Sequence, residues 1–98
     1  MINGKTIVIT GSNSGIGLET LKLLANGNNK ILAVDLRTDR IEALNLKNVF
    51  PMVCDVSTKE NVDSIFTTAT EKLGSIDIFF ANAGFPYYET MNYVNWER

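Results

Sequence analysis

The 98-residue chain has no histidine and a single cysteine, Cys54. Structural zinc sites take about four cysteine or histidine ligands, so this composition argues against one. One thiol cannot form an internal disulfide, and its place in an apolar run favours a buried small side chain over a reactive one. We therefore expect neither a metal site nor a disulfide framework.

Long apolar segments and an excess of positive charge are also missing. The first apolar run, Ile7-Val8-Ile9, is too short for a signal-peptide core or a membrane span. The formal net charge is −2, so the strong attraction to a phosphate backbone that nucleic-acid binding needs has no source. These features predict a cytoplasmic protein that binds neither membrane nor nucleic acid.

The sequence instead alternates short apolar runs with longer stretches of helical period. This alternation is typical of βαβ units, which build a parallel sheet covered by helices. The length suits a single domain over residues 1–98. The expected strands are Thr6–Thr10, Lys30–Val34, Val49–Cys54 and Ile76–Ala81.

Two helices are expected between the first three strands. The residues Asn26-Gly27-Asn28-Asn29 should supply the left-handed conformations that end the first helix. A shorter helix is expected over Thr38–Leu44, capped by Thr38 or Asp39. The apolar stripe of the first helix, which we interpret as core packing, consists of Ile16, Leu18, Leu21, Leu24 and Ala25.

The third expected helix has the clearest pattern. Ser57-Thr58-Lys59-Glu60 matches a capping box, in which the Ser57 oxygen and the Glu60 carboxylate each accept from a free backbone N–H. Gly74 stands just past the helix end as a C-cap. One face carries Val62, Ile65, Phe66, Ala69 and Leu73.

Pro51 indicates the order of the strands. Proline cannot donate to a sheet ladder and is found mostly at edges and bulges. In the doubly wound order 3-2-1-4 the third strand is an edge of this half of the sheet. The sequence therefore predicts an α/β fold with a partial, doubly wound parallel sheet, its first two helices on one face and the third on the other.

A glycine-rich turn joins the first strand directly to the first helix. Gly11 can allow the tight turn, Gly15 can let a pyrophosphate approach the backbone, and Gly17 can let the helix pack close to the strand. The N–H groups and positive end of the helix then form an anion site, as in Rossmann-type folds. A turn without a ligand is the alternative. The predicted binding segment is Gly11, Ser12, Asn13, Ser14, Gly15, Ile16 and Gly17.

Asp35 ends the second expected strand. It follows Gly17 at close to the spacing of about 20 residues expected for the acid that bonds an adenosine ribose. A carboxylate there accepts from the 2′- and 3′-hydroxyls and repels a 2′-phosphate, which favours NAD over NADP. Arg37 could pair with such a phosphate, whereas Leu36, which we also place at the cofactor, could not. Taken alone, Asp35 could be a solvated loop carboxylate.

The glycine spacing departs from G-x-G-x-x-G and resembles the Thr-Gly-x-x-x-Gly-x-Gly pattern of the short-chain dehydrogenase/reductase family. Three further segments match that family in order and spacing, so the resemblance covers essentially the whole chain. It implies that Asp55-Val56 contact the adenine ring. It also implies that Asn82-Ala83-Gly84 brace the sheet and line the nicotinamide ribose, and that Trp96-Glu97-Arg98 open the next helix.

Asp55 and Asn82 also make sense without the family. Both follow the carboxyl ends of expected strands, where ligands bind in open α/β sheets. For either residue alone, a helix or turn cap is the commoner role. Asp55 could simply cap the turn into Ser57.

The resemblance implies hydride transfer between the nicotinamide and a small alcohol or carbonyl substrate, with a tyrosine as acid/base and a serine that holds the substrate oxygen. The family places a lysine four residues after that tyrosine, because a phenol with a pKa of about 10 is a poor base without a nearby cation. Lys72 is the last lysine here, so no tyrosine can take this role. The positions four after Tyr87, Tyr88 and Tyr93 are Met91, Asn92 and Glu97.

We therefore assign no catalytic residue and expect the chain to be the inactive N-terminal part of a longer, homo-oligomeric enzyme. Without the later elements, Ile76–Ala81 would form an apolar sheet edge, and a polypeptide of these residues alone should associate. A non-catalytic nucleotide-binding or scaffold module is the alternative function. A methyltransferase is less favoured, because Thr10 and the Asn82 segment fit the dehydrogenases better. The substrate is not indicated.

Overall fold

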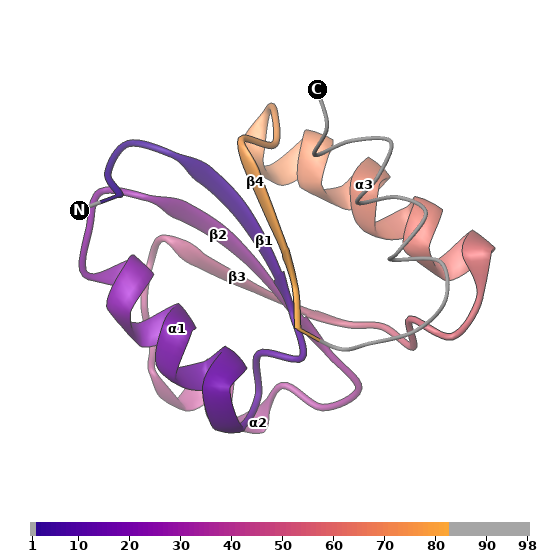
Figure 1. Cartoon of the computed structure of the whole chain (residues 1–98), viewed down its shortest axis with the longest axis horizontal. Coiled ribbons are helices and arrows are strands. Elements are labelled where there is room, and N and C mark those ends of the chain that lie inside the picture. The colour runs from indigo at the N-terminus through magenta and orange to yellow at the C-terminus, as the bar shows by residue number, and fades with distance from the viewer. Residues whose placement is uncertain (1, 83–98) are drawn as a thin grey trace.

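The computed structural model describes residues 2–82, which form a parallel sheet with helices on both faces (Figure 1). The sheet order is β3-β2-β1-β4, as predicted. The strands are β1 (Thr6–Thr10), β2 (Lys30–Asp35), β3 (Val49–Val53) and β4 (Ile78–Ala81). The helices are α1 (Gly15–Ala25), α2 (Asp39–Ala43) and α3 (Lys59–Leu73).

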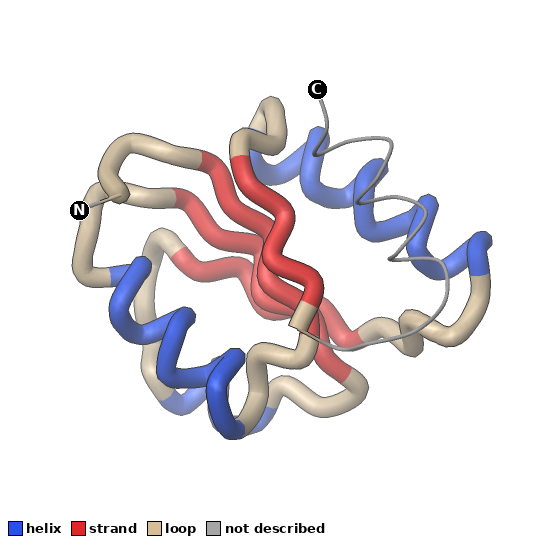
Figure 2. The backbone as a smooth tube through the Cα atoms, viewed as in Figure 1, coloured by secondary structure: helices blue, strands red, loops and turns tan. Residues whose placement is uncertain are grey.

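The two sides of the sheet carry different helices. Figure 1 shows α1 and α2 on one face and α3 on the other, which is the predicted arrangement. The strands lie side by side in one sheet (Figure 2), and because all pairs are parallel, their carboxyl ends share one rim. Thr10 lies between Val34 of β2 and Ala81 of β4 at that rim.

The core consists of two layers, because alternate residues of a strand point to opposite faces. Ile7 and Ile9 of β1 pack toward α1, whereas Val8 packs toward α3. The β-branched residues of the two central strands, β1 and β2, are covered on both sides, whereas β3 and β4 are only partly buried. The buried residues on the α1 side are Ile7, Ile9, Leu18, Leu21, Ile31, Ala33, Ile41 and Val49, and those on the α3 side are Val8, Leu32, Val34, Val62, Ile65, Ala69, Leu73 and Phe79.

The edge position predicted for the third strand is confirmed. Within the described residues, β3 pairs with β2 alone, and Pro51 lies opposite Ala33. Because no described strand pairs with the outer side of β3, the absence of an N–H group at Pro51 loses no hydrogen bond there.

The predicted end of the first helix is correct in position but wrong in mechanism. Positive φ angles are absent from residues 26–29, and Asn26 itself has φ −68°. The Nδ2 of Asn29 donates to the Leu24 carbonyl at 2.8 Å, and the Nδ2 of Asn48 donates to the Ala25 carbonyl at 3.2 Å. Side-chain amides from beyond the helix thus satisfy its last carbonyls.

These two asparagines, which we call the amide brace, also join the starts of three strands. Asn29 is almost fully buried, and its Oδ1 accepts from the Lys5 N–H at 2.9 Å. The Asn48 Nδ2 donates to the Asn29 carbonyl at 2.7 Å. Lys5, Asn29 and Asn48 directly precede β1, β2 and β3, so the amide brace ties the amino ends of the sheet together.

The capping box predicted for Ser57 and Glu60 is wrong, because α3 has a simple N-cap one residue later. Thr58 is the N-cap of α3, with extended backbone angles, and its hydroxyl accepts from the Asn61 N–H at 3.2 Å. Ser57 lies in the preceding turn, where its N–H donates to the Asp55 carboxylate at 3.0 Å. The predicted apolar face of α3 and the C-cap at Gly74, with φ +87°, are confirmed.

The fourth strand begins at Ile78 rather than at Ile76. Before it, the Asp77 carboxylate accepts from the Thr6 N–H at 2.9 Å and from the Thr6 hydroxyl at 3.1 Å. These bonds, first from the backbone and then from the side chain of Thr6, hold the pKa of Asp77 below its ordinary value. The Asp77 N–H also donates to the Thr6 carbonyl at 2.8 Å, so both the backbone and the side chain of Asp77 bind Thr6 ahead of β4.

Residues 2–82 contain neither a membrane-spanning helix nor a cluster of metal ligands. In this stretch, none of the helices is long and apolar enough to cross a bilayer. The same residues contain no cluster of three or more acidic, cysteine or histidine side chains placed to hold a metal ion.

Candidate functional site

The glycine-rich turn between β1 and α1 lies at the point where the sheet changes direction. From β1 the chain continues through α1 to β2, whereas β4 joins the other side of β1 after α3 has crossed the opposite face. In open α/β sheets, ligands bind outside the carboxyl ends of the strands at such a switch point. The sequence-predicted segment is therefore placed where a ligand would bind.

Gly11 and Gly17 have the structural roles that their spacing predicted, while the approach of a pyrophosphate to Gly15 stays a prediction. Gly11 and Gly15 have positive φ angles, +66° and +55°. A Cβ on Gly17 would lie 1.9 Å from the Gly11 carbonyl oxygen, so only glycine permits this approach of α1 to the turn. A Cβ on Gly15 would meet no described atom within 4 Å, so the backbone there faces open space.

The first turn of α1 presents its backbone outward. Ser14 is the N-cap in an extended conformation, and its side chain makes no capping bond to any described residue. The first N–H groups of a helix have no acceptor within the helix and suit an anion. Ile16, interpreted from its spacing as a core residue, is 73% exposed, so that part of the core prediction is wrong. Its assignment to the binding segment stays a prediction.

Ser12 is the member of the segment that faces inward. It is fully buried, and its hydroxyl donates to the Val34 carbonyl at 3.2 Å while its N–H donates to the same oxygen at 3.3 Å. Ser12 thus fastens the turn to β2, and its side chain does not line the open side of the turn.

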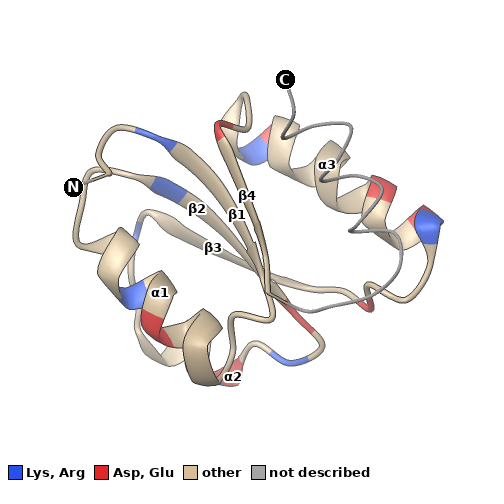
Figure 3. Cartoon of the chain, viewed as in Figure 1, with Lys and Arg blue, Asp and Glu red and all other residues tan. Residues whose placement is uncertain are grey.

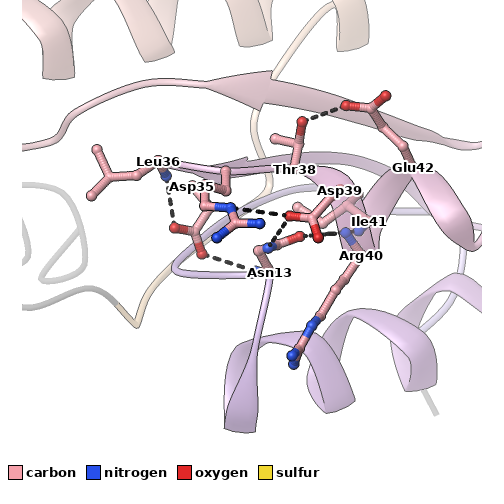
Figure 4. A network of polar contacts seen from close by, with 9 residues as sticks. Asn13, Asp35, Leu36, Thr38, Asp39, Arg40, Ile41 and Glu42 are labelled. Atoms are coloured by element: carbon pink, nitrogen blue, oxygen red, sulfur yellow. Dashed lines mark hydrogen bonds and ion pairs between the residues drawn. The ribbon is translucent and has the colours of Figure 1, made fainter.

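Asp35, at the end of β2, is brought directly against the glycine-rich turn (Figure 4). Its Oδ2 accepts from the Asn13 N–H at 2.9 Å, and its Oδ1 accepts from the Leu36 N–H at 2.7 Å. A carboxylate oxygen has two acceptor sites, so each retains capacity for a further donor. The side chain is half-buried and fixed by two bonds, which orients it for a ligand hydroxyl.

Asn13 organises the site in a way that sequence reasoning missed. Its Oδ1 accepts from the N–H groups of Arg40 at 2.8 Å and Ile41 at 3.2 Å, which are free donors in the first turn of α2. Thr38 holds the N-cap position predicted for it, but its hydroxyl donates to Glu42 instead of capping the backbone. Asn13 therefore caps α2 from a distant turn, and no local sequence pattern predicts this contact.

A cleft of about 350 Å³ lies beside this network. Both acidic and basic groups occur in it, and across the described part of the chain charges of both signs are interspersed (Figure 3). The Asp39 Oδ1 accepts from the Asn13 Nδ2 at 3.1 Å and lies 3.5 Å from the Arg37 Nε. The lining residues are Asn13, Ser14, Asp35, Leu36, Arg37, Asp39 and Arg40.

The hydrogen bond from Asn13 is the main reason that the pKa of Asp39 lies below its ordinary value. Arg37 and Arg40 lower the pKa further by charge attraction, while desolvation opposes them. Asp39 is therefore ionised at neutral pH and contributes a second negative charge to the cleft.

Asp55 and Val56 lie away from this cleft. The Asp55 carboxylate accepts from the Ser57 N–H, and its carbonyl accepts from the Asn61 Nδ2 at 2.8 Å. Val56 packs against the core beneath α3. The turn cap that was the alternative for Asp55 is thus formed, and adenine contact stays a prediction for both residues.

Asn82 connects β4 to the glycine-rich turn. Its Nδ2 donates to the Gly11 carbonyl at 3.1 Å, the same oxygen that a Cβ on Gly17 would strike. This bond ties β4 to the turn, while contact of Asn82 with the nicotinamide ribose stays a prediction. Ala83, Gly84, Trp96-Glu97-Arg98 and the three tyrosines lie outside the described residues.

A 3-2-1-4 parallel sheet with a glycine-rich turn at its switch point defines a Rossmann-type, doubly wound α/β domain. Residues 5–98 match the family model of the short chain dehydrogenases, so the chain belongs to this family of oxidoreductases.

Individual relatives agree with the family assignment. The chain is 36% identical over 87 residues to an uncharacterized oxidoreductase of Staphylococcus saprophyticus, covering 85% of this chain and 35% of that protein. The 3-ketoacyl-(acyl-carrier-protein) reductase from Brucella melitensis, solved with NADH, is 30% identical with a TM-score of 0.72, over 79% of this chain and 33% of that one.

The L-sorbose reductase from Gluconobacter frateurii, solved with NADPH and L-sorbose, is 37% identical with a TM-score of 0.75. The match covers 86% of this chain and 35% of that one. The chain thus spans about a third of the length of the relatives it matches.

Proposed function

We propose that this chain is the NAD(H)-binding part of a short-chain oxidoreductase that transfers hydride between the nicotinamide and an alcohol or carbonyl substrate. When bound, the nicotinamide supplies the hydride acceptor or donor. The observation that carries the proposal is the Asp35 carboxylate, which is fixed against the glycine-rich turn by the Asn13 N–H at 2.9 Å. Family membership supports the reaction class.

The solved relatives do not indicate one cofactor, because one holds NADH and another holds NADPH. Each Asp35 oxygen already accepts one backbone N–H and has capacity for one ribose hydroxyl. A fixed negative charge at this position also opposes a 2′-phosphate. These two effects act in the same direction and favour NAD(H).

Other residues of the turn suit the rest of a dinucleotide. Open space over Gly15 and the outward-facing first turn of α1 would admit a pyrophosphate, with the N–H groups of Gly15 and Ile16 as donors. Leu36 is 64% exposed beside Asp35 and offers an apolar surface to the adenosine. These contacts position the cofactor, while the groups that would move the proton are not assigned within this chain.

The test titrates the complete protein with NADH and NADPH by fluorescence. Asp35→Ala should weaken NADH binding by about 10- to 100-fold, because hydrogen bonds to a charged group contribute about 1.5–3 kcal/mol. Asp63→Ala is the matched control, since Asp63 is an exposed acid on α3 that pairs with Lys59. Tighter binding of NADPH than of NADH to the unaltered protein would contradict the cofactor assignment.

The complete protein is further proposed to be a cytoplasmic homo-oligomer. The first part follows from the short apolar run at the start of the sequence, and the second from the resemblance to a family whose members usually associate. Cell fractionation and light scattering of the complete protein test the two parts separately.

A further inference from the structure

Arg37 is the cation closest in sequence to Asp35, and its side chain has a partner in the cleft. Its Nε lies 3.5 Å from the Asp39 Oδ1. That same oxygen accepts from the Asn13 Nδ2 at 3.1 Å. Asn13 is itself immobilised, because its Oδ1 accepts from two N–H groups of α2 and only 9% of the residue is exposed.

We propose that Asp39, held in place by Asn13, is a second specificity-determining residue of the dinucleotide site: it engages the Arg37 guanidinium and so withholds that cation from a 2′-phosphate. This inference rests on the proposed function and deepens it. Asp35 would then repel a 2′-phosphate by its own charge. Asp39 would engage the Arg37 guanidinium, the neighbouring cation that could otherwise offset this repulsion.

The strength of this arrangement comes from Asn13 rather than from the ion pair alone. The side chains of Arg37 and Asp39 are 80% and 57% exposed, and an isolated pair of that kind contributes little. Here, however, one partner is already fixed by a nearly buried amide, so less side-chain entropy is lost when Arg37 joins it.

Arg40 does not take over the role of Arg37 in this arrangement. Its backbone N–H is bound to Asn13, and its side chain extends away from Asp35 and Asp39 (Figure 4). The cation that a 2′-phosphate beside Asp35 would recruit is therefore Arg37. The Asn13 bond, and more weakly the charges of both arginines, lower the pKa of Asp39, so its carboxylate keeps its charge at more acidic pH than an ordinary aspartate.

A double-mutant cycle in the complete protein tests the inference, with Asp39→Asn, Arg37→Ala and the two combined. Asp39→Asn should tighten NADPH binding by about two- to fivefold and change NADH binding by less than about twofold, the scale of one exposed ion pair. The asparagine can still accept from Asn13, so α2 should keep its cap. Asp63→Asn on α3 is the matched control.

Arg37→Ala supplies the second arm of the cycle. In the unaltered protein it should leave NADPH affinity nearly unchanged, because the guanidinium is already engaged. In the Asp39→Asn background it should cancel the gain. An equal effect of Arg37→Ala in both backgrounds, or no gain from Asp39→Asn, would overturn the role of Asp39. Failure of the unaltered protein to bind either dinucleotide would instead count against the proposed function.

Discussion

Replacing Gly17 with alanine probes the closest approach in the site. The new Cβ would lie 1.9 Å from the Gly11 carbonyl oxygen, whereas real Cβ atoms essentially never come within 3.0 Å of such a neighbour. The obstacle is backbone, so no rotamer change relieves it, and α1 must withdraw by about 1 Å. Leu18 and Leu21, buried against the sheet, would move with the helix.

Overpacking of this kind lowers the free energy of unfolding by about 1–3 kcal/mol. We expect Gly17→Ala to lie near the upper end of this range, because the main chain must move. For a protein of about the length of its relatives, a loss of about 3 kcal/mol lowers the unfolding midpoint by about 6–12 °C. Thermal unfolding of the complete protein, followed by circular dichroism, measures this shift. NADH titration should show weakened binding as well, since the first turn of α1 is displaced.

Gly15→Ala is the matched control. Its positive φ makes alanine strained by about 1–2 kcal/mol, but a methyl group there meets no described atom within 4 Å. It should therefore destabilise less than Gly17→Ala while still reducing NADH affinity, because the methyl would occupy the space proposed for the pyrophosphate. An unfolding midpoint for Gly17→Ala equal to or above that of Gly15→Ala would refute the packing argument.

Two further predictions concern stability. Thr58→Ala should lower the free energy of unfolding by about 1 kcal/mol, because the hydroxyl that accepts from the Asn61 N–H is lost. Ser57→Ala should leave it nearly unchanged. Urea unfolding of both variants measures the difference, and the reverse order would indicate a cap at Ser57. The Thr6 bonds lower the pKa of Asp77 in the folded protein. The stability that Asp77 contributes is therefore complete above its unfolded-state pKa near 3.8 and is lost as the pH falls through its lower folded-state pKa. Asp77→Asn should remove that part of the acid sensitivity, and an unchanged pH profile of unfolding in this variant would contradict it.

The sequence allowed the architecture to be predicted because the informative signals are local. Periodicity located the strands, Pro51 indicated the edge, and the handedness of parallel crossovers then placed the helices on their faces. The pairing of the glycine-rich turn with Asp35 was also predictable, since both follow adjacent strands at the same rim. Ile16 was misjudged because helical spacing cannot tell a core face from an exposed first turn.

The contacts that complete the site were not predictable for a different physical reason. Asn13 caps a helix through Arg40, 27 residues further along the chain, and Asn29 and Asn48 bind the last carbonyls of α1 from outside it, so these bonds depend on tertiary proximity. The sequence around an asparagine in a loop does not indicate which distant backbone group its side chain will bind. The error between Ser57 and Thr58 has a local cause, because the two hydroxyls have similar capping preferences and Asp55 decides between them by folding the turn.

The amide brace has a consequence for how the molecule responds to its surroundings. Asn29 and Asn48 hold the amino ends of the strands with uncharged groups, which neither titrate nor attract counterions. At the opposite rim, Asp35, Arg37 and Asp39 are all ionic and are screened by salt. The amide brace itself should thus be insensitive to ionic strength and acidity, which act at this end of the sheet through Asp77 instead, so the loops at the carboxyl rim could be redesigned without loosening the brace.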